Sequence, residues 1–535
     1  MAALTDFQEI KLLLSEEGSI KLENAGAIFK TIDDFISTTL KSLSDRKFTC
    51  DSSLVEVLEL IFTSFIAREP LNEGVLCLTN CFRLCRNLLA IDPSCQAEFL
   101  TSTLLQQTCS VLYKVLNKQQ RSENEIVLLR CSVQFLGNFC SGNKANTYEV
   151  WKHCRQLFRD LLKAEDNKLQ EYVLLVVNLI LSCPTIDKDI LTCRQNGPEP
   201  MDEGLKKSPT HVECSPLHGN GDPTKVSTDQ TLRGEIGPAP ALENEAETVW
   251  SLLKDCLNIT ADTQSENGLL VVEACLTLPD CLGNVFPNLS LKTRLLALEV
   301  SLSILGRLSD GSPGGGGGGA DPPAHQPPHI SNLLFLAADF VHQHSLIPEL
   351  ASTHSAEDKV LCIVKELECL CLATALHQMY ATLQDNDQLL TTAIKLLSDI
   401  EDLGSQEGGV FSPVDKISRG SEVNTDHPVY GLKRDLIQLV ANLVYRNTHN
   451  QNMVRELDAI PLILNKTTID ARNPFICQWA VFAAHNLTEG NEENRAYIRA
   501  LRLEGMANNQ ALLDEMGLSA EMKGDRVVVK KAKTN

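Results

Sequence analysis

The sequence predicts an all-α protein built as a repeated helical solenoid, and three observations support this prediction. Aromatic residues make up only 5% of the 535 residues and Leu is abundant, which favours helices over the aromatic-rich strands of a β-sandwich. Hydrophobic residues, at 43%, are numerous enough to form a core. Near the C-terminus, an asparagine frame is written twice at an offset of 44 residues, which indicates repeated units.

The frame begins with "ANLVYRNTHNQN" at Ala441 and recurs with "HNLTEGNEENR" at His485. The residues that match at this offset are Asn442 and Asn486, Leu443 and Leu487, Asn447 and Asn491, Asn450 and Asn494, Arg455 and Arg499, and Leu457 and Leu501. We expect the Asn-Leu pair to close the last helix of each unit. The Asn-rich turn after it would redirect the chain into the next unit.

The same frame is found upstream. Asn138 is followed by asparagines at plus five and plus eight, Asn87 has Asp92 at plus five, and Asn178 keeps only the first position. The intervals of 51 residues from Asn87 to Asn138, 40 to Asn178 and 44 from Asn442 to Asn486 bracket the length of an armadillo or HEAT unit. The expected fold is therefore an armadillo/HEAT-like alpha solenoid interrupted by disordered linkers.

Composition divides this solenoid into blocks. Residues 195–245 hold seven of the 22 prolines, and residues 309–330 contain a glycine run flanked by prolines, so neither stretch is expected to be helical. The expected order is N-terminal armadillo-like repeats at 1–194, a disordered linker at 195–245, degenerate helical repeats at 246–308, a Gly/Pro-rich linker at 309–330, degenerate helical repeats at 331–403, a flexible linker at 404–427 and an armadillo repeat pair with a basic tail at 428–535.

The last unit shows the local pattern most clearly. Asn473 is a good N-cap and Pro474 suits a first helical position, which predicts a helix from there to about Thr488. A shorter helix opened by Pro461 is expected before it. Apolar residues of the longer helix fall on one face at Ile476, Ala480, Ala483 and Leu487, and a neighbouring face carries Phe475, Trp479, Phe482 and Asn486. Two occupied faces predict contacts on both sides.

Charge and composition exclude several classes of function. A formal charge of -21 argues against nucleic acid or an anionic membrane as the main partner, because both require clustered Lys and Arg. The start lacks the basic and apolar regions of a signal peptide, and the longest apolar run, "YVLLVV", is far shorter than the roughly 20 residues that span a bilayer. Nineteen scattered cysteines fit a reducing cytosol better than a disulfide framework.

The motifs of catalysis are also missing from the sequence. The glycines at 314–319 have no following Lys-Ser/Thr, and neither a Gly-x-Ser-x-Gly elbow nor a His-Glu-x-x-His motif occurs. Cys77, Cys81 and Cys85 share one helical stripe but have no distant second pair, so buried apolar fillers are favoured over zinc ligands. We therefore expect neither catalytic residues nor cofactor-binding or metal-binding residues.

The repeat pair resembles a known family. "NLVYRNTHNQNMVRELDAIPLIL" and "NPFICQWAVFAAHNLTEGNEEN" are similar to the C-terminal domain of the ataxin-10 family of armadillo-type solenoid proteins. The resemblance is strong from about Pro428 to Val529, moderate from Leu78 to Trp151 and faint from Val285. It implies a non-enzymatic cytoplasmic scaffold that self-associates. It also implies links to neuronal survival and neurite growth, to cytokinesis and to centrosome or cilium-base biology.

The resemblance also implies partners and locations. The partners are proteins: O-linked N-acetylglucosamine transferase, a heterotrimeric G-protein beta subunit and mitotic kinases, with no nucleic acid and no membrane insertion. The implied location is cytoplasmic and perinuclear, and also the midbody and the centrosome or cilium base. The alternative hypothesis is a regulatory subunit or activator of a single signalling enzyme or GTPase, in which the same solenoid changes one partner's activity.

Two groups of candidate residues follow. Asn442, Trp479, Phe482 and Asn486 form the candidate partner surface, where the asparagines would bind an extended peptide. A competing and favoured interpretation is that the asparagines cap or bridge helices inside the solenoid. The candidate phosphosites each precede a proline in a soft segment, although ordinary linker composition explains the same pattern; they are Ser208, Ser215, Ser312 and Ser412.

Overall fold

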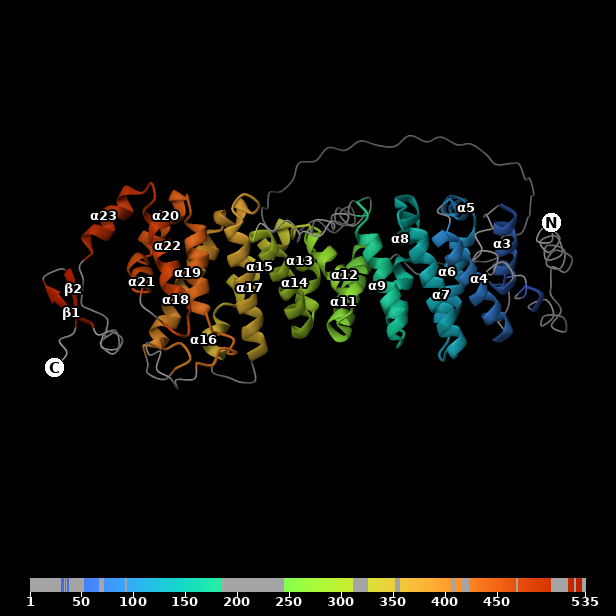
Figure 1. The fold of residues 1–535 in the computed structure, drawn as a ribbon, viewed down its shortest axis with the longest axis horizontal. Coiled ribbons are helices and arrows are strands. Elements are labelled where there is room, and N and C mark those ends of the chain that lie inside the picture. The colour runs from blue at the N-terminus through green and yellow to red at the C-terminus, as the bar shows by residue number, and fades with distance from the viewer. Residues whose placement is uncertain are drawn as a thin grey trace, which may run out of the picture.

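The computed structural model describes most of the chain as a long row of helices running from α3 to α23 (Figure 1). The described residues are 30–32, 34, 36–37, 52–66, 72–91, 94–184, 186, 245–310, 326–351, 357–405, 409–414, 423–467, 470–501, 518–523 and 526–531. The predicted linker at 195–245 lies outside the described residues except for residue 245. The predicted linker at 309–330 lies outside them except for residues 309–310 and 326–330.

The first part of the row contains helices of very different length. They are α3 (Ser52–Ile66), α4 (Asn72–Ile91), α5 (Cys95–Thr101), α6 (Leu104–Leu116), α7 (Glu123–Cys140), α8 (Lys144–Leu162) and α9 (Asn167–Leu181). Polar side chains cap several of them: Ser122 and Glu125 form a reciprocal capping box at α7, and Asn143 accepts hydrogen bonds from two backbone amides at the start of α8.

The middle of the row continues without strands among its described residues. It comprises α11 (Glu245–Thr263), α12 (Glu266–Thr277), α13 (Cys281–Val285), the 3-10 turn η1 (Phe286–Asn288), α14 (Leu291–Ser309), α15 (Ile330–Gln343), α16 (Leu346–Leu350), α17 (Glu357–Ala375), the 3-10 turn η3 (Ala381–Asp385) and α18 (Asp387–Gly404).

The C-terminal part holds the repeat pair and a hairpin. Its elements are α19 (Leu432–Leu443), α20 (Thr448–Glu456), α21 (Ile460–Leu464), α22 (Ile476–Thr488), α23 (Glu492–Ala500), β1 (Leu518–Lys523) and β2 (Arg526–Lys531). The strands pair antiparallel, with Leu518 opposite Lys531. This hairpin is a short local exception to the helical architecture, and the basic tail begins inside its second strand. "RVVVKK" is rich in β-branched residues, which favours the extended conformation.

The helices form two packed layers, as a solenoid requires. In the ladder layer each helix packs against the next, in the order α4, α7, α9, α12, α14, α17, α19 and α22. In the second layer the order is α3, α6, α8, α11, α13, α15 and α18. The buried side chains between the layers belong to one continuous hydrophobic core. The solenoid prediction is confirmed by this stacking.

The stacking continues past residues 187–244. Helix α9 packs against α12, and α8 packs against α11. Polar contacts join the same helices: Arg159 donates to Asp255 across 3.0 Å, and Asn267 donates to Glu171 across 3.0 Å. The repeats predicted at 1–194 and at 246–308 therefore belong to one stacked array rather than to two separate bodies.

Some helical segments of the array are both long and apolar. Among the described residues, the segment Glu73–Ile91 of α4 is long and apolar enough to cross a membrane, and so is the sharply bent pair formed by Glu266–Thr277 and Cys281–Asn288. Most of the α4 segment is buried in the solenoid, where it packs against α7. A core helix of this kind meets the same test of length and composition.

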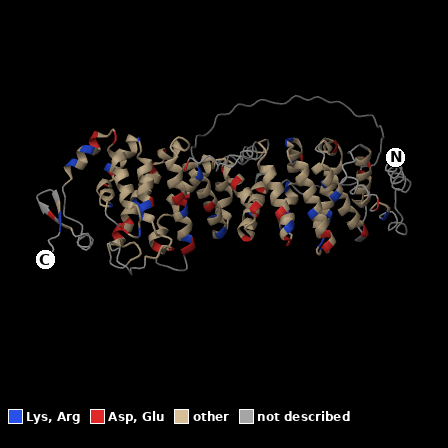
Figure 2. Ribbon diagram, viewed as in Figure 1, with Lys and Arg blue, Asp and Glu red and all other residues tan. Residues whose placement is uncertain are grey.

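Both signs of charge are spread along the row of helices (Figure 2). Lys and Arg lie among Asp and Glu over most of the length of the solenoid, and many of them form pairs across neighbouring helices, such as Arg130 with Asp166 and Lys292 with Asp262. The net negative charge is thus distributed rather than gathered at one end.

Candidate protein-interaction site

The asparagines that open the repeat frame join consecutive ladder helices. The side-chain nitrogen of Asn442 in α19 donates to the Cys371 carbonyl of α17 across 3.0 Å and to the Thr374 hydroxyl across 3.2 Å. That of Asn486 in α22 donates to the Ala441 carbonyl of α19 across 3.0 Å. The two residues are 3% and 0% exposed. Asn442 and Asn486 therefore bridge buried backbone, as the favoured interpretation predicts, and they do not lie on an open partner surface.

The next two asparagines of the frame start the following helix. Asn447 and Asn491 are the N-caps of α20 and α23, and each accepts a hydrogen bond from the backbone amide three residues later. Those later residues, Asn450 and Asn494, donate to the Leu443 and Leu487 carbonyls at the end of the preceding helix. The spacings of plus five and plus eight are therefore the N-cap and the third helical position.

A glutamine from the preceding unit completes the arrangement, and the sequence analysis missed it. Gln451 donates to the Asn486 carbonyl across 2.8 Å, and Gln384 donates to the Asn442 carbonyl across 2.9 Å. Asn450 and Asn494 return hydrogen bonds to the Gln384 and Gln451 carbonyls, at 2.8 and 3.1 Å. We call this set of bridging asparagine, N-cap asparagine, third-position asparagine and preceding-unit glutamine the Asn/Gln clasp.

The clasp recurs in the N-terminal part of the chain. Asn138 of α7 donates to the Arg86 carbonyl of α4 across 2.9 Å, and Gln96 donates to the Asn138 carbonyl across 3.1 Å. Asn143 is the N-cap of α8, and Asn146 donates to the Phe139 carbonyl across 3.0 Å. A glutamine nine residues after the first asparagine, as at Gln96 after Asn87 and Gln451 after Asn442, was the signal available in the sequence.

The start of α22 differs from the prediction. Asn473 does not cap its own helix; its side-chain oxygen accepts the backbone amides of Lys433 and Arg434, at 2.9 and 3.4 Å, at the start of α19. Helix α19 begins after Gly431, which has a φ of 84° and no capping side chain, so Asn473 supplies the cap from another segment. Helix α22 begins at Ile476, after Phe475 in the left-handed conformation.

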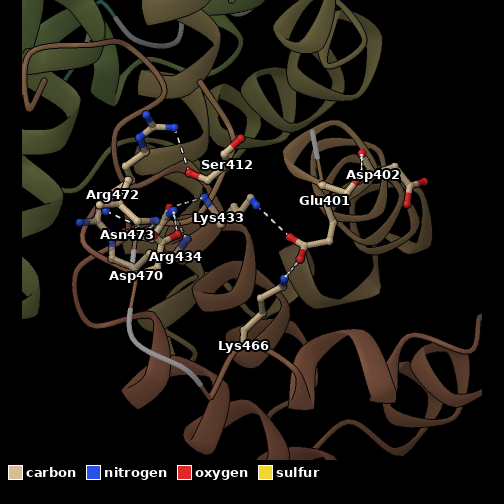
Figure 3. Close-up of polar contacts among 11 residues, drawn as sticks. Glu401, Asp402, Ser412, Lys433, Arg434, Lys466, Asp470, Arg472 and Asn473 are labelled. Carbon is tan, nitrogen blue, oxygen red and sulfur yellow. Dashed lines mark hydrogen bonds and ion pairs between the residues drawn. The ribbon is translucent and has the colours of Figure 1, made fainter. Parts of the chain in front are cut away.

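A buried polar junction surrounds Asn473 (Figure 3). Asp470 accepts hydrogen bonds from the side chain of Asn473 and from the backbone amide of Val414, at 2.7 and 3.1 Å. Arg472 donates to the Ser412 carbonyl across 2.9 Å, and the Ser412 side chain is itself buried. Residues 409–414 are thus an ordered part of the repeat pair. The flexible-linker prediction for 404–427 is wrong there, and Ser412 is not an exposed phosphosite.

The same junction contains an ion pair that crosses from α18 to the repeat pair. Glu401 accepts a hydrogen bond from Lys433 across 2.8 Å and also pairs with Lys466 (Figure 3). Burial by itself raises the pKa of Glu401, but the hydrogen bonds from these two lysines outweigh it and hold the pKa below its ordinary value. The repeat pair is therefore fastened to the preceding helices by charge as well as by apolar packing.

The other candidate phosphosites, Ser208, Ser215 and Ser312, lie outside the described residues. Cys77, Cys81 and Cys85 are buried in α4, in accordance with a packing role. Within the described ranges, no group of three or more His, Cys, Asp or Glu side chains is arranged to hold a metal ion.

The outward face of α22 is the open part of the predicted partner surface. Ile476, Ala480, Ala483 and Leu487 are buried on the inward side. Phe475, Val481 and Phe482 are 67%, 56% and 42% exposed, and the ring of Trp479 meets that of Phe482 edge to face at 5.8 Å. We call Phe475, Trp479, Val481 and Phe482 the terminal apolar face. Trp479 and Phe482 were predicted to belong to the partner surface. Phe475 was predicted only to share their helix face, and Val481 was predicted for neither.

A second candidate is a cavity of about 420 Å³ beside α14, α15 and α17. It is lined by Pro287, Arg294, Phe335, Asp339, His342, Gln343, Ser345, Leu346 and Lys359. Behind it, burial together with the neighbouring Asp339 raises the pKa of Glu366 to about 9. The lining mixes cationic, anionic and apolar groups, so its chemistry selects no single class of ligand.

Comparison with known proteins gives the context for the repeat pair. The model of the spinocerebellar ataxia type 10 protein domain matches residues 432–530, which include α19 to α23 and all but the last residue of the hairpin. Ataxin-10 of Xenopus tropicalis is 28% identical over 456 residues, which cover 85% of this chain and 80% of that protein. Ataxin-10 of Homo sapiens is 26% identical over 466 residues, which cover 86% and 83%.

A shorter match has a higher identity. An ataxin-10 homolog of Dictyostelium discoideum is 43% identical over 97 residues, which cover 18% of this chain and 16% of that protein. A solved chain from a study of the interaction between cadherin and beta-catenin aligns over 91% of this chain and 96% of its own length, but with a TM-score of 0.27 and 10% identity it carries no argument. The long matches and the domain match together show that this chain is similar to ataxin-10 proteins over most of its length.

Proposed function

We propose that the chain is a non-enzymatic scaffold that binds other proteins, including a second copy of itself, through the terminal apolar face. The observation that carries this proposal is the exposure of Phe475, Val481 and Phe482 on and beside α22, the last ladder helix among the described residues. Exposed apolar side chains that gather on one face are typical of contact surfaces, whereas scattered ones are ordinary.

The sequence of the repeat pair supports this assignment. At the 44-residue offset, Phe482 corresponds to Gln438 of α19, so the terminal unit carries an aromatic residue where the inner unit carries an amide. Aromatic residues are enriched in the centres of protein interfaces. The matching domain model also has a name that refers to homo-association.

The finer roles rest on the similarity to ataxin-10 proteins. We propose that the scaffold acts in the cytoplasm, near the nucleus and at the midbody and cilium base, in neurite growth and survival and in cytokinesis. Its proposed partners are the transferase, the G-protein beta subunit and the mitotic kinases named above. The alternative, regulation of one enzyme or GTPase, predicts one stoichiometric partner when the protein is purified from cells, whereas a scaffold predicts several substoichiometric ones.

The self-association part is tested by sedimentation velocity over a range of protein concentrations. Phe482→Glu should lower the assembled fraction strongly, because a charge at the centre of an apolar contact must be desolvated. Tyr113→Glu is the matched control, since Tyr113 is a similarly exposed aromatic residue on α6. Equal assembly of both variants and the unaltered chain would refute the placement of the surface.

A further inference from the structure

Two cysteines from adjacent units lie in contact on the second layer of the solenoid. Cys109 belongs to α6 and Cys154 to α8, and their sulfur atoms are 3.3 Å apart. These two helices pack against each other. A disulfide needs a sulfur separation of about 2.0 Å, so the two side chains have to approach by little more than about 1 Å. The contact therefore joins two units that are separated by 45 residues of sequence.

The two sulfur atoms differ in their surroundings. Cys109 is partly exposed, whereas Cys154 is fully buried. Hydrogen bonding with Cys154 lowers the pKa of the Cys109 thiol, and the same hydrogen bond together with burial raises the pKa of Cys154. The pair therefore favours one arrangement, in which Cys154 keeps its proton and donates it toward the Cys109 sulfur. That arrangement sets the accessible sulfur as the nucleophile and the buried one as the resolving thiol.

Other cysteines provide natural comparisons. Among the cysteines that the structure describes, only Cys109 and Cys477 are partly exposed. Cys477 donates to the Thr467 carbonyl, and the described part of the chain places no second thiol against it. Cys275 and Cys281 interact with each other, but both are buried. Cys109 thus combines access from solvent with a neighbouring thiol, whereas Cys477 and the Cys275/Cys281 pair each have one of these two properties.

We propose that Cys109 and Cys154 form a modification site for oxidants of the peroxide class, which convert the pair into a disulfide linking α6 to α8. The Cys109 thiolate attacks one peroxide oxygen, the O–O bond breaks, and a sulfenic acid and one water are formed. The Cys154 sulfur then attacks the Cys109 sulfur, its proton leaves with the hydroxide as a second water, and the S–S bond forms. Two thiols and one hydrogen peroxide give one disulfide and two waters.

The link is reversible by a dithiol reductant, which takes up the disulfide through two exchange steps and is itself oxidised. In the oxidised form, two consecutive units are covalently joined on the second layer, where noncovalent packing alone joins them in the reduced form. The cross-link lowers the conformational entropy of the unfolded chain and therefore stabilises this part of the solenoid against local opening.

The test uses the full-length reduced protein. It is treated with one equivalent of hydrogen peroxide, alkylated with N-ethylmaleimide, digested with trypsin without reduction and analysed by mass spectrometry. The expected product links peptide 153–155 to peptide 87–114, with fragmentation placing the bond on Cys109 rather than on Cys95. A dithiol reductant should remove the linked product. Cys477 should not yield an intramolecular disulfide, and the Cys275/Cys281 pair should be alkylated only after unfolding.

Cys154→Ser provides the second readout. Without a resolving thiol, Cys109 should stop at the sulfenic acid, which dimedone traps, and the linked peptide should be lost. Cys109→Ser should lose both products. Helical circular dichroism checks that the variants fold, and Cys154→Ala serves if the serine variant does not. The proposal is overturned if Cys109 remains fully alkylated under conditions that oxidise Cys477, or if Cys109 oxidises in the unaltered protein without linking to Cys154.

Discussion

Helices α19 and α22 carry the same sequence frame but occupy different positions in the solenoid. Ile437 of α19 and Val481 of α22 correspond at the 44-residue offset, and both are branched aliphatic residues. Ile437 is 0% exposed and Val481 is 56% exposed. Helix α19 packs against both α17 and α22, whereas α22 has α19 as its ladder neighbour in the described part of the chain.

The two helices therefore share the residues of the clasp but differ in how far their opposite faces are buried. The Asn/Gln clasp is local to one junction, so it forms at both helices from residues of the same types. Burial of the opposite face depends on whether another helix follows. A repeat unit cannot bury its apolar face alone, so the last unit among the described residues needs either a polar outer face or another segment that covers it. The α22 unit carries Phe482 where the inner unit carries Gln438, so its outer face is apolar, which favours coverage by a partner over a polar outer face.

The largest expected effect compares the corresponding aliphatic positions. Ile437→Glu buries a charge without a partner and should lower the free energy of unfolding by about 4 kcal/mol or more. Val481→Glu places the same carboxylate in water and should change it by less than about 0.5 kcal/mol. Urea unfolding followed by circular dichroism measures both. Similar losses for the two variants would mean that the α22 face is covered in solution even in the isolated chain.

A second contrast concerns a carboxyl group inside the ladder layer. Burial and the nearby Asp339 raise the pKa of Glu366 in α17 to about 9, far above its value of about 4.3 in an unfolded chain. Between these values the folded protein keeps the proton and the unfolded chain loses it, so this group lowers stability as pH rises, by at most about 1.4 kcal/mol per pH unit.

Glu366→Gln should remove that dependence. Relative to the unaltered protein, the variant should gain stability progressively from pH 5 to pH 8, as measured by urea unfolding at each pH. Val481→Glu is the control, because its exposed carboxylate should titrate at an ordinary pKa and leave the slope unchanged. Parallel stability curves for Glu366→Gln and the unaltered chain would contradict the buried, protonated state of Glu366.

A smaller effect is expected from the clasp itself. Asn442→Ala and Asn486→Ala each remove a buried amide donor from a backbone carbonyl of the preceding ladder helix, which should cost about 1 to 3 kcal/mol of stability. Asn178→Ala is the matched control, since Asn178 also precedes a Leu near the end of a ladder helix, but its side chain makes no hydrogen bond to another described residue. Equal losses at all three positions would show that the bridging hydrogen bonds contribute little.

The asparagines of the repeat frame could be predicted from the sequence, whereas the roles of Asn473 and Gln384 could not. The 44-residue offset located both clasps because each junction needs a buried amide donor, and Asn supplies it in both. The role of Asn473 was hidden, because its partners Lys433 and Arg434 lie 40 and 39 residues away and a local N-cap looks the same in sequence. The role of Gln384 was also hidden, because the position nine residues before it holds Ala375 rather than the Asn that precedes Gln96 and Gln451 at this spacing.

The exposed residues were predictable only in part. Phe482 differs in character from Gln438, so a comparison of the two frames reveals it. Val481 corresponds to an aliphatic residue that is buried, and only the end of the ladder decides its exposure. The ordered structure of residues 409–414 could not be predicted either, because the local Gly and Pro content is typical of a linker. The backbone amide of Val414 is bound by Asp470, which lies in a distant segment of the sequence.

The central claim, that the terminal apolar face is where copies of this chain meet, is tested most directly by hydroxyl-radical footprinting of the unaltered protein. Oxidation of Phe475, Trp479 and Phe482 is followed by mass spectrometry from dilute to concentrated solution, with Tyr113 as the internal reference. The account predicts that oxidation of these three residues falls as sedimentation shows assembly, while Tyr113 stays equally oxidised. Assembly without protection of the α22 residues would contradict it.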